Sequence, residues 1–392
     1  TKAEKEQILT VANFTAHRSP ERFIYRGLSL NSRHIDWHMF SEVSMRQYMK
    51  DEIRERLQMI RDTAESADGR CITPSHETLL HLAAGLGEVQ LLNRLLQRHA
   101  DPNVQIILPQ QAFPSIPDSE QGNTPLTYAC QPGMDDSTPL PVHNRISCLN
   151  LLIQYGADVN KPGPLGWPPL VITCVAGIGG APYEESALFL LKCGADISLQ
   201  PELKGKKTSL LTWATAAGYP LLVRKLCEAG YDPNFRGEMV PPLLSLNLNT
   251  PNTALQIAHI LLEYGADVNA AMPASTTLPE TTGDTALLNL CRQLAFIDVS
   301  QLPQIRELVS LFISEGADVN HQNAAGETPL MACCRGMLLG DDSLDRLKLG
   351  IARLLLDHRA DPSLRDKYGR TALQRIGNRS NEHLQMVLKY LP

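Results

Sequence analysis

The chain has 392 residues, of which 43% are hydrophobic and 20% are charged, and its formal net charge at pH 7 is −6. This composition is typical of a folded protein, and the small negative charge gives no general attraction for nucleic acid or for an anionic membrane. No apolar run approaches the roughly 20 residues that a membrane-spanning helix needs, and residues 1–17 lack the basic start and apolar block of a secretion signal. We therefore expect a soluble, cytoplasmic protein that binds neither nucleic acid nor membrane.

Residues 1–75 contain no repeat, and we predict that they form a helical N-terminal cap or extension. Residues 41–66 have the apolar spacing of one amphipathic helix. Its simplest role is to cover the open end of a helical array, and a separate partner-binding module is the alternative. His34, Asp36 and His38 alternate as metal ligands on a strand would, but neither a cysteine nor a second cluster accompanies them. We expect no metal site and no cofactor.

Two short phrases alternate from residue 76 to the end of the chain. The turn phrase GADVN occurs at residues 156–160, 265–269 and 316–320, and HADPN, GADIS, GYDPN and RADPS are its variants. The opening phrase is Thr-Pro-Leu or a variant of it, and it begins at Thr78, Thr124, Pro168, Ser209, Thr285, Thr328 and Thr371, with a weaker copy at Pro241. An uninterrupted unit has 23 residues from opening to turn and 10 more to the next opening, so the period is 33.

The residues of both phrases favour particular local structures. Thr at a helix N-cap accepts a backbone N–H, and Pro at the first helical position gives up a donor that has no partner there. Thr124-Pro125 and Thr328-Pro329 therefore predict helix starts. The apolar stretch at residues 148–155 predicts a second helix, which ends at Gly156 because glycine adopts the left-handed C-cap conformation at little cost. The following Asp suits a turn, because its side chain bonds nearby backbone N–H groups.

The period and the stretch TLLHLAAGLGEVQLLNRLLQRHADPN at residues 78–103 resemble the ankyrin repeat. The resemblance covers about residues 76–392, as about seven units and a C-terminal capping unit. It implies an all-α ankyrin-repeat solenoid of helix-turn-helix units with hairpin-like loops. Roughly ten extra residues separate the two helices of units two, six and seven, and the turn loops at residues 104–121 and 270–282 are long.

The sequence favours a protein without chemistry of its own. The nine cysteines include one adjacent pair, Cys333 and Cys334, and form neither a disulfide framework nor a metal motif. The glycine-rich run at residues 177–182 lacks the Lys-Ser/Thr of a phosphate loop. Four cysteines lie six residues after the residue that opens their unit, a place that predicts small buried packing residues rather than nucleophiles: Cys130, Cys174, Cys291 and Cys334.

The resemblance implies a concave recognition surface made of helix starts and turn loops. The aromatic and basic residues that map to this surface are our candidate partner-binding residues: Trp167, Phe235, Arg236, Arg292, Arg335, Arg365, Lys367 and Arg370. Arg292 and Arg335 both lie seven residues after their opening Thr, so we expect them side by side in a basic stripe. Residues 335–392 carry eleven Lys and Arg against seven Asp and Glu. A solvated end cap is one interpretation of this charge, and a partner with an acidic surface is the other.

We therefore predict a scaffold that binds a partner protein. The alternative is a host-directed bacterial effector, active in the host cytoplasm, with a small catalytic site in the N-terminal segment or an insertion. Nucleic-acid binding is a third and weaker interpretation.

Overall fold

The computed structural model describes residues 78–106, 122–131, 142–163, 166–178, 183–198, 202–203, 206–207, 209–234, 240–274, 281–294, 301–335 and 342–375. The chain divides into two compact units, residues 1–205 and residues 206–392. The predicted cap at residues 1–75, and with it the helix at residues 41–66 and the His34, Asp36 and His38 cluster, lies outside the described residues.

The described elements are helices, apart from two strands of two residues each. The first unit contains α4 (Leu79–Gly85), α5 (Val89–Gln97), α6 (Pro125–Cys130), α7 (Val142–Gln154), α8 (Pro169–Gly177), α9 (Glu184–Lys192) and β1 (Glu202–Leu203). The second unit contains β2 (Lys206–Lys207), α10 (Leu210–Ala217), α11 (Pro220–Glu228), η3 (Pro242–Ser245), α12 (Pro251–Glu263), α13 (Ala286–Gln293), α14 (Leu302–Ser314), α15 (Pro329–Cys334), α16 (Asp342–Asp357) and η7 (Leu373–Arg375).

The opening phrases start helices, as predicted. Thr124 Oγ1 accepts a hydrogen bond from Thr127 N (3.1 Å), and Thr328 Oγ1 accepts one from Met331 N (3.2 Å). Pro125 and Pro329 follow at the first helical position. Each cap therefore satisfies one of the backbone donors that a helix start leaves without a partner.

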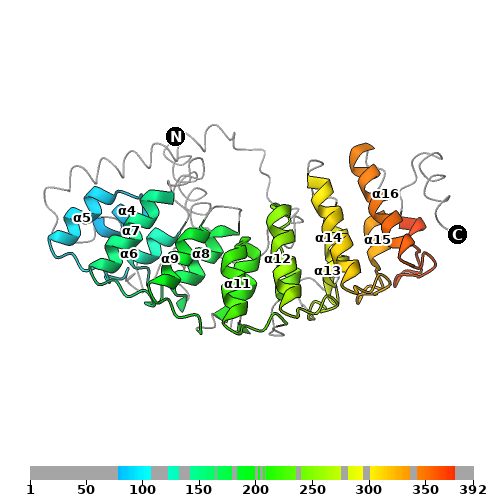
Figure 1. Cartoon of the computed structure of the whole chain (residues 1–392), viewed down its shortest axis with the longest axis horizontal. Helices are drawn as coiled ribbons and strands as arrows, with labels where there is room; N and C mark the ends of the chain where they lie inside the picture. The colour runs from blue at the N-terminus through cyan, green and yellow to red at the C-terminus, as the bar shows by residue number, and fades with distance from the viewer. Residues whose placement is uncertain are drawn as a thin grey trace, which may run out of the picture. The chain divides into compact units, whose positions relative to one another are not determined.

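Helices of the same kind stack on one another within each unit (Figure 1). In the first unit α4 packs on α6 and α6 on α8, while α5 packs on α7 and α7 on α9. In the second unit α13 packs on α15, and α12, α14 and α16 pack in succession. Contacts between neighbouring repeats bury the apolar faces that one helix pair leaves open. The fold is therefore the predicted all-α stack of helix pairs.

The four cysteines of the shared slot are buried in these stacks, as predicted for packing residues. Cys130, Cys174, Cys291 and Cys334 all belong to first helices and are at most 1% exposed. Burial raises the pKa of the Cys130 thiol to about 12, so it stays protonated at neutral pH. These thiols serve as small apolar side chains.

The turn phrase ends the second helix of a unit, as predicted. Gly156 follows α7 with a φ of 92°, which glycine adopts without the steric cost of a Cβ atom. His99 and Arg359 stand at the equivalent place, with φ values of 63° and 68°. The next Asp closes the turn, since Asp158 Oδ1 accepts a hydrogen bond from Asn160 N (2.8 Å).

The Asn of the turn phrase bridges to the following turn. Asn103 Nδ2 donates to the carbonyl oxygen of Gly156 (2.8 Å), and Asn103 Oδ1 accepts from Asp158 N (2.8 Å). The same pair of bonds is made by Asn160 in the first unit and by Asn234, Asn269 and Asn320 in the second. The last turn phrase of each unit has Ser198 or Ser363 instead, and its hydroxyl bonds the Asp of its own turn. The repeated pentapeptide is therefore both a turn and a tie between repeats.

Three irregularities of the repeat have local causes. The weak fifth opening forms the short 3-10 helix η3, which begins at the second of two consecutive prolines, Pro241 and Pro242. The extra residues of units two, six and seven partly lengthen second helices, since α7, α14 and α16 have 13, 13 and 16 residues and α5 has nine. The two long turn loops are closed at their base, where Ile106 bonds Gly122 and Asn123, and Met272 bonds Gly283 and Asp284.

Candidate protein-binding surface

Two hairpins of the second unit, at residues 323–327 and 365–370, have the same pattern of hydrogen bonds. In the first, Asn323 Oδ1 accepts from Ala325 N and Glu327 N, both at 2.9 Å. In the second, Asp366 Oδ1 accepts from Tyr368 N and Arg370 N, both at 2.9 Å. One side-chain oxygen thus fixes each hairpin from within. The two hairpins are also joined, because Lys367 N donates to the carbonyl oxygen of Ala325 (3.0 Å).

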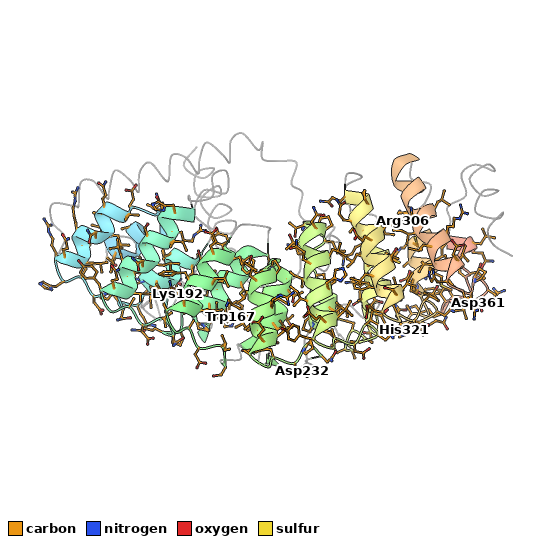
Figure 2. The ribbon with its side chains drawn as sticks, in the orientation of Figure 1. Trp167, Lys192, Asp232, Arg306, His321 and Asp361 are labelled. Atoms are coloured by element: carbon orange, nitrogen blue, oxygen red, sulfur yellow. The ribbon has the colours of Figure 1, made fainter. Side chains whose placement is uncertain are left out.

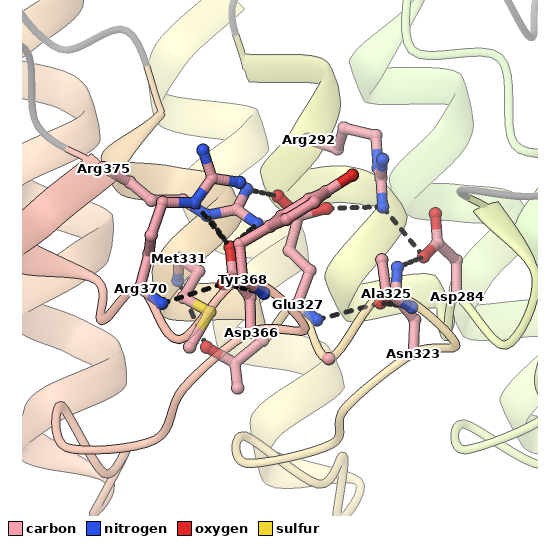
Figure 3. Close-up of polar contacts among 12 residues, drawn as sticks. Asp284, Arg292, Asn323, Ala325, Glu327, Met331, Asp366, Tyr368, Arg370 and Arg375 are labelled. Carbon is pink, nitrogen blue, oxygen red and sulfur yellow. Dashed lines mark hydrogen bonds and ion pairs between the residues drawn. The ribbon is translucent and has the colours of Figure 1, made fainter.

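A chain of alternating charges connects these hairpins (Figure 3). Arg292 Nη2 lies 3.0 Å from Asp284 Oδ1 and 2.7 Å from Glu327 Oε2. Glu327 also pairs with Arg375, whose Nη2 lies 2.7 Å from Asp366 Oδ2. Arg370 Nε completes the chain, 2.9 Å from the same oxygen. Three carboxylates and three guanidinium groups therefore compensate one another across the last three repeats, and we call these six residues the ion-pair chain.

The carboxyl groups at the two ends of the ion-pair chain, Asp284 and Asp366, have pKa values shifted in opposite directions. Burial raises the pKa of Asp284 to about 6, since Arg292 and Asn323 only partly offset the lost solvation and the Glu327 charge adds to the rise. Burial also acts to raise the pKa of Asp366, but the backbone N–H groups of Arg370 and Tyr368 and the Arg375 and Arg370 side chains outweigh it. The pKa of Asp366 is therefore held well below its usual range.

The predicted stripe of Arg292 and Arg335 is corrected by this arrangement. Helix α13 continues to Gln293, so Arg292 lies within it and turns onto the buried carboxylates, where its side chain is 16% exposed. Helix α15 ends at Cys334, so Arg335 follows the helix end with an extended backbone. Arg335 is exposed and makes no ion pair among the described residues. Although Arg292 and Arg335 hold equivalent positions in the sequence, the charge of Arg292 is neutralised by carboxylates and that of Arg335 is exposed to solvent.

The expectation for Trp167, which is labelled in Figure 2, is also wrong. This residue is only 2% exposed, so it cannot be a surface anchor. It precedes the opening Pro168, and the residues in the equivalent place of other units, Asn123, Asp284 and Glu327, are buried as well. This position faces the packed interior in each of these repeats. Phe235 and Arg236 lie outside the described residues.

The last hairpin carries the remaining predicted residues on its surface. Arg365, Lys367 and Arg370 are exposed, and Tyr368 between them is 68% exposed. Tyr368 was not predicted from the sequence, although an aromatic residue beside a turn glycine in the run Asp-Lys-Tyr-Gly-Arg is a usable signal. The buried carboxylates that stand directly before two opening threonines were not predicted either. The hairpin thus exposes one aromatic and three basic side chains together.

Two findings on the described residues concern metal binding and membrane spans. The described residues hold no group of three or more His, Cys, Asp or Glu side chains that could bind a metal ion. Within the same ranges, no helix is long and apolar enough to cross a membrane. Within the ion-pair chain, Arg292 and Arg375 are mostly buried, whereas Arg370 pairs with Asp366 through Nε and is still half exposed. Arg365 and Lys367 beside it are exposed as well.

The comparisons with known proteins agree with the repeat pattern. A family model of the ankyrin repeat matches residues 75–106, 121–163 and 325–367. The protein phosphatase 1 regulatory subunit 27 of Homo sapiens is 39% identical over 51 residues, which are 13% of this chain and 30% of the relative. The putative ankyrin repeat protein FPV031 of fowlpox virus is 28% identical over 177 residues, 45% of this chain and 44% of the relative.

A bacterial protein is similar over a longer stretch. The putative ankyrin repeat protein YahD of Escherichia coli is 28% identical over 199 residues, 50% of this chain and 85% of the relative. The chain spans less than half the length of the human and viral relatives. Matched segments lie at both ends of the described helix stacks, whose caps, turns and pairing follow one plan. The chain therefore carries ankyrin repeats, as its residue pattern predicts.

Proposed function

We propose that the chain binds another protein, and that this partner presents an acidic surface to the basic side chains exposed in the last repeats of the second unit. The observation that carries the proposal is the contrast between two sets of cations. Arg292 and Arg375 are neutralised by buried carboxylates, whereas Arg335, Arg365 and Lys367 are exposed and make no ion pair among the described residues.

Exposed charges of one sign favour the encounter with a partner of the other sign and suppress contacts with the wrong ones. The relative named as a regulatory subunit of a protein phosphatase supports a role in contacting another protein. The chain as a whole has a net charge of −6, so its basic side chains act through local clustering and not through the total charge. This favours one defined face over diffuse attraction.

The test is affinity capture with the full chain, followed by binding measurements on the captured partner. The variant Arg335→Glu/Lys367→Glu reverses the charge at two exposed positions, and we expect it to bind the partner markedly more weakly than the parent does. The difference in affinity between parent and variant should become smaller at high salt. The matched control is Arg306→Glu, which makes the same kind of change at an exposed position on α14 (Figure 2). Equal binding by the parent and the double variant at low salt would contradict the proposal.

The effector alternative places a catalytic site in residues 1–75 or in an insertion. Residues 1–75 lie outside the described residues, as do parts of the insertions, and no observation on the described residues favours this alternative.

A further inference from the structure

The last hairpin is a rigid platform. Arg365 Nη1 donates to the carbonyl oxygen of Gly369 (2.7 Å), and Gly369 N donates to the carbonyl oxygen of Asp366 (2.8 Å). Asp366 is buried below and holds both flanking backbone N–H groups. The apex residues Lys367, Tyr368 and Arg370 therefore project from a backbone that is already fixed, which lowers the entropy lost when a ligand binds.

Two cations sit over the ring of Tyr368. Lys367 Nζ lies 5.1 Å from the ring centroid, and Arg370 Cζ lies 4.8 Å from it. Cation–π attraction at these distances keeps both charged ends beside the ring. The hydroxyl group lies at the ring edge, so the apex brings an ammonium, a guanidinium and a phenol hydroxyl together.

These groups have hydrogen bonds left to donate. Among the described residues, neither Lys367 Nζ nor the Tyr368 hydroxyl has a hydrogen-bond partner or an ion pair. Arg370 uses only Nε, which bonds Asp366 Oδ2, so both of its terminal nitrogens remain. The three side chains thus offer several donors and, apart from the hydroxyl oxygen, no acceptor.

We propose that Lys367, Tyr368 and Arg370 form a binding site for a carboxylate group, supplied by an Asp or Glu in an acidic segment of a partner protein. The proposal rests on the proposed function and adds Tyr368 as the residue that determines specificity. A carboxylate accepts from all three groups, and charge-assisted hydrogen bonds are the strongest of their kind. Nucleic acid fits less well, because base stacking needs an open ring face and two cations already lie over this ring.

The test uses the full chain and a fluorescent all-glutamate peptide, with the all-glutamine peptide as its uncharged counterpart. Tyr368→Phe removes one hydroxyl and leaves the net charge and the ring unchanged. We expect its affinity for the all-glutamate peptide to fall by about tenfold, the equivalent of one charge-assisted hydrogen bond. Tyr368→Ala should lose more, because it also releases the two cations. Tyr155→Phe is the matched control, since Tyr155 is an exposed tyrosine of the first unit.

Each result has a defined meaning. If Tyr368→Phe binds the all-glutamate peptide as tightly as the parent, the site is overturned, while the charge-reversal test still decides the proposed function. Equal affinity of the parent for the all-glutamate and all-glutamine peptides also overturns the site. Tighter binding of a single-stranded oligonucleotide than of the acidic peptide overturns the choice of a protein carboxylate.

Discussion

The guanidinium group of Arg292 lies between Glu327 and Asp284, with Nη2 2.7 Å from Glu327 Oε2 and 3.0 Å from Asp284 Oδ1. The side chains of both carboxylates are at most 3% exposed. Removing one partner of a buried ion pair leaves a charge with neither water nor a counterion, which costs more than the pair contributes when intact. Arg292 therefore belongs to the fold, not to the surface.

We expect Arg292→Met to lower the free energy of unfolding by about 3 kcal/mol, because it leaves Asp284 without its only ionic partner among the described residues. Urea denaturation followed by the helical circular dichroism signal measures the change. Arg292→Glu should lower the unfolding free energy further, because it places a third carboxylate beside Asp284 and Glu327.

Arg335→Met is the control for this prediction. It changes the same residue type in the equivalent position of the next unit, but at an exposed site with no ion pair among the described residues. Its unfolding free energy should stay within about 0.5 kcal/mol of the parent. Equal losses in the two variants would show that the ion-pair chain does not stabilise the second unit.

Asp284 gives stability an unusual pH dependence. Its pKa is raised from an ordinary 3.8 to about 6, so between these values the native state holds a proton that the unfolded state has lost. Stability from this group is full below pH about 4 and is lost as the pH rises through about 6, with a total of up to about 3 kcal/mol. Asp366 acts in the opposite sense, and its contribution is lost as the pH falls below the usual aspartate range.

Asp284→Asn isolates the first effect, because the amide does not titrate and its oxygen can still accept from Asn323. The unfolding free energy of the variant minus that of the parent should increase from pH 4 to pH 7. Denaturation curves at four pH values across this range measure it. A difference that stays constant with pH would mean that Asp284 titrates alike in the folded and unfolded chain.

In the described part of the chain, two turns hold a non-glycine residue in the left-handed conformation, His99 with φ 63° and Arg359 with φ 68°. His99→Gly should raise the unfolding free energy by about 1 kcal/mol, since glycine adopts this conformation without the Cβ clash. The reverse change, Gly156→Ala, should lower it by about 1 kcal/mol. Apart from Gly156 and its two chain neighbours, no atom of the described residues lies within 4 Å of a Cβ added there, so this loss reports the backbone conformation. Thermal unfolding of both variants measures these changes. A lower stability of His99→Gly than of the parent would contradict the inference that the backbone of His99 is strained.

The helix caps and the turn glycines could be predicted because each depends on residues fewer than six apart. The repeat could be predicted because these local phrases recur with a period of 33. The ion-pair chain could not be predicted in this way. Glu327 and Arg375 are 48 residues apart, and their pairing depends on how two repeats stack. Arg292 is mostly buried and Arg335 is exposed because α13 extends past Arg292 whereas α15 ends before Arg335. The opening phrase that the two units share does not predict where each helix ends.

Side-chain exposure was the property that the sequence predicted least well. Trp167 was expected at the surface because it precedes a helix, yet the same place is buried in the repeats of Asn123 and Glu327. Tyr368 was not considered, although it is the most exposed of the large hydrophobic side chains in the described part of the chain. Aromatic residue type alone does not distinguish a core position from an apex, since that depends on which repeat covers it.

The Asn of the turn phrase gives the last prediction. Asn269 Nδ2 donates to the carbonyl oxygen of Gly316 (3.0 Å), and its Oδ1 accepts from Asp318 N (2.8 Å), so one side chain makes two bonds to the following repeat. Asn269→Ala should lower the unfolding free energy by about 1–2 kcal/mol, the value of two partly solvated hydrogen bonds. Ser363→Ala is the control, because the Ser363 hydroxyl bonds Asp361 of its own turn and no other described residue. It should cost less than Asn269→Ala in the same urea denaturation. If both variants lose the same small amount, the turn phrase is only a helix stop, and the bridging bonds add nothing to the coupling of the repeats.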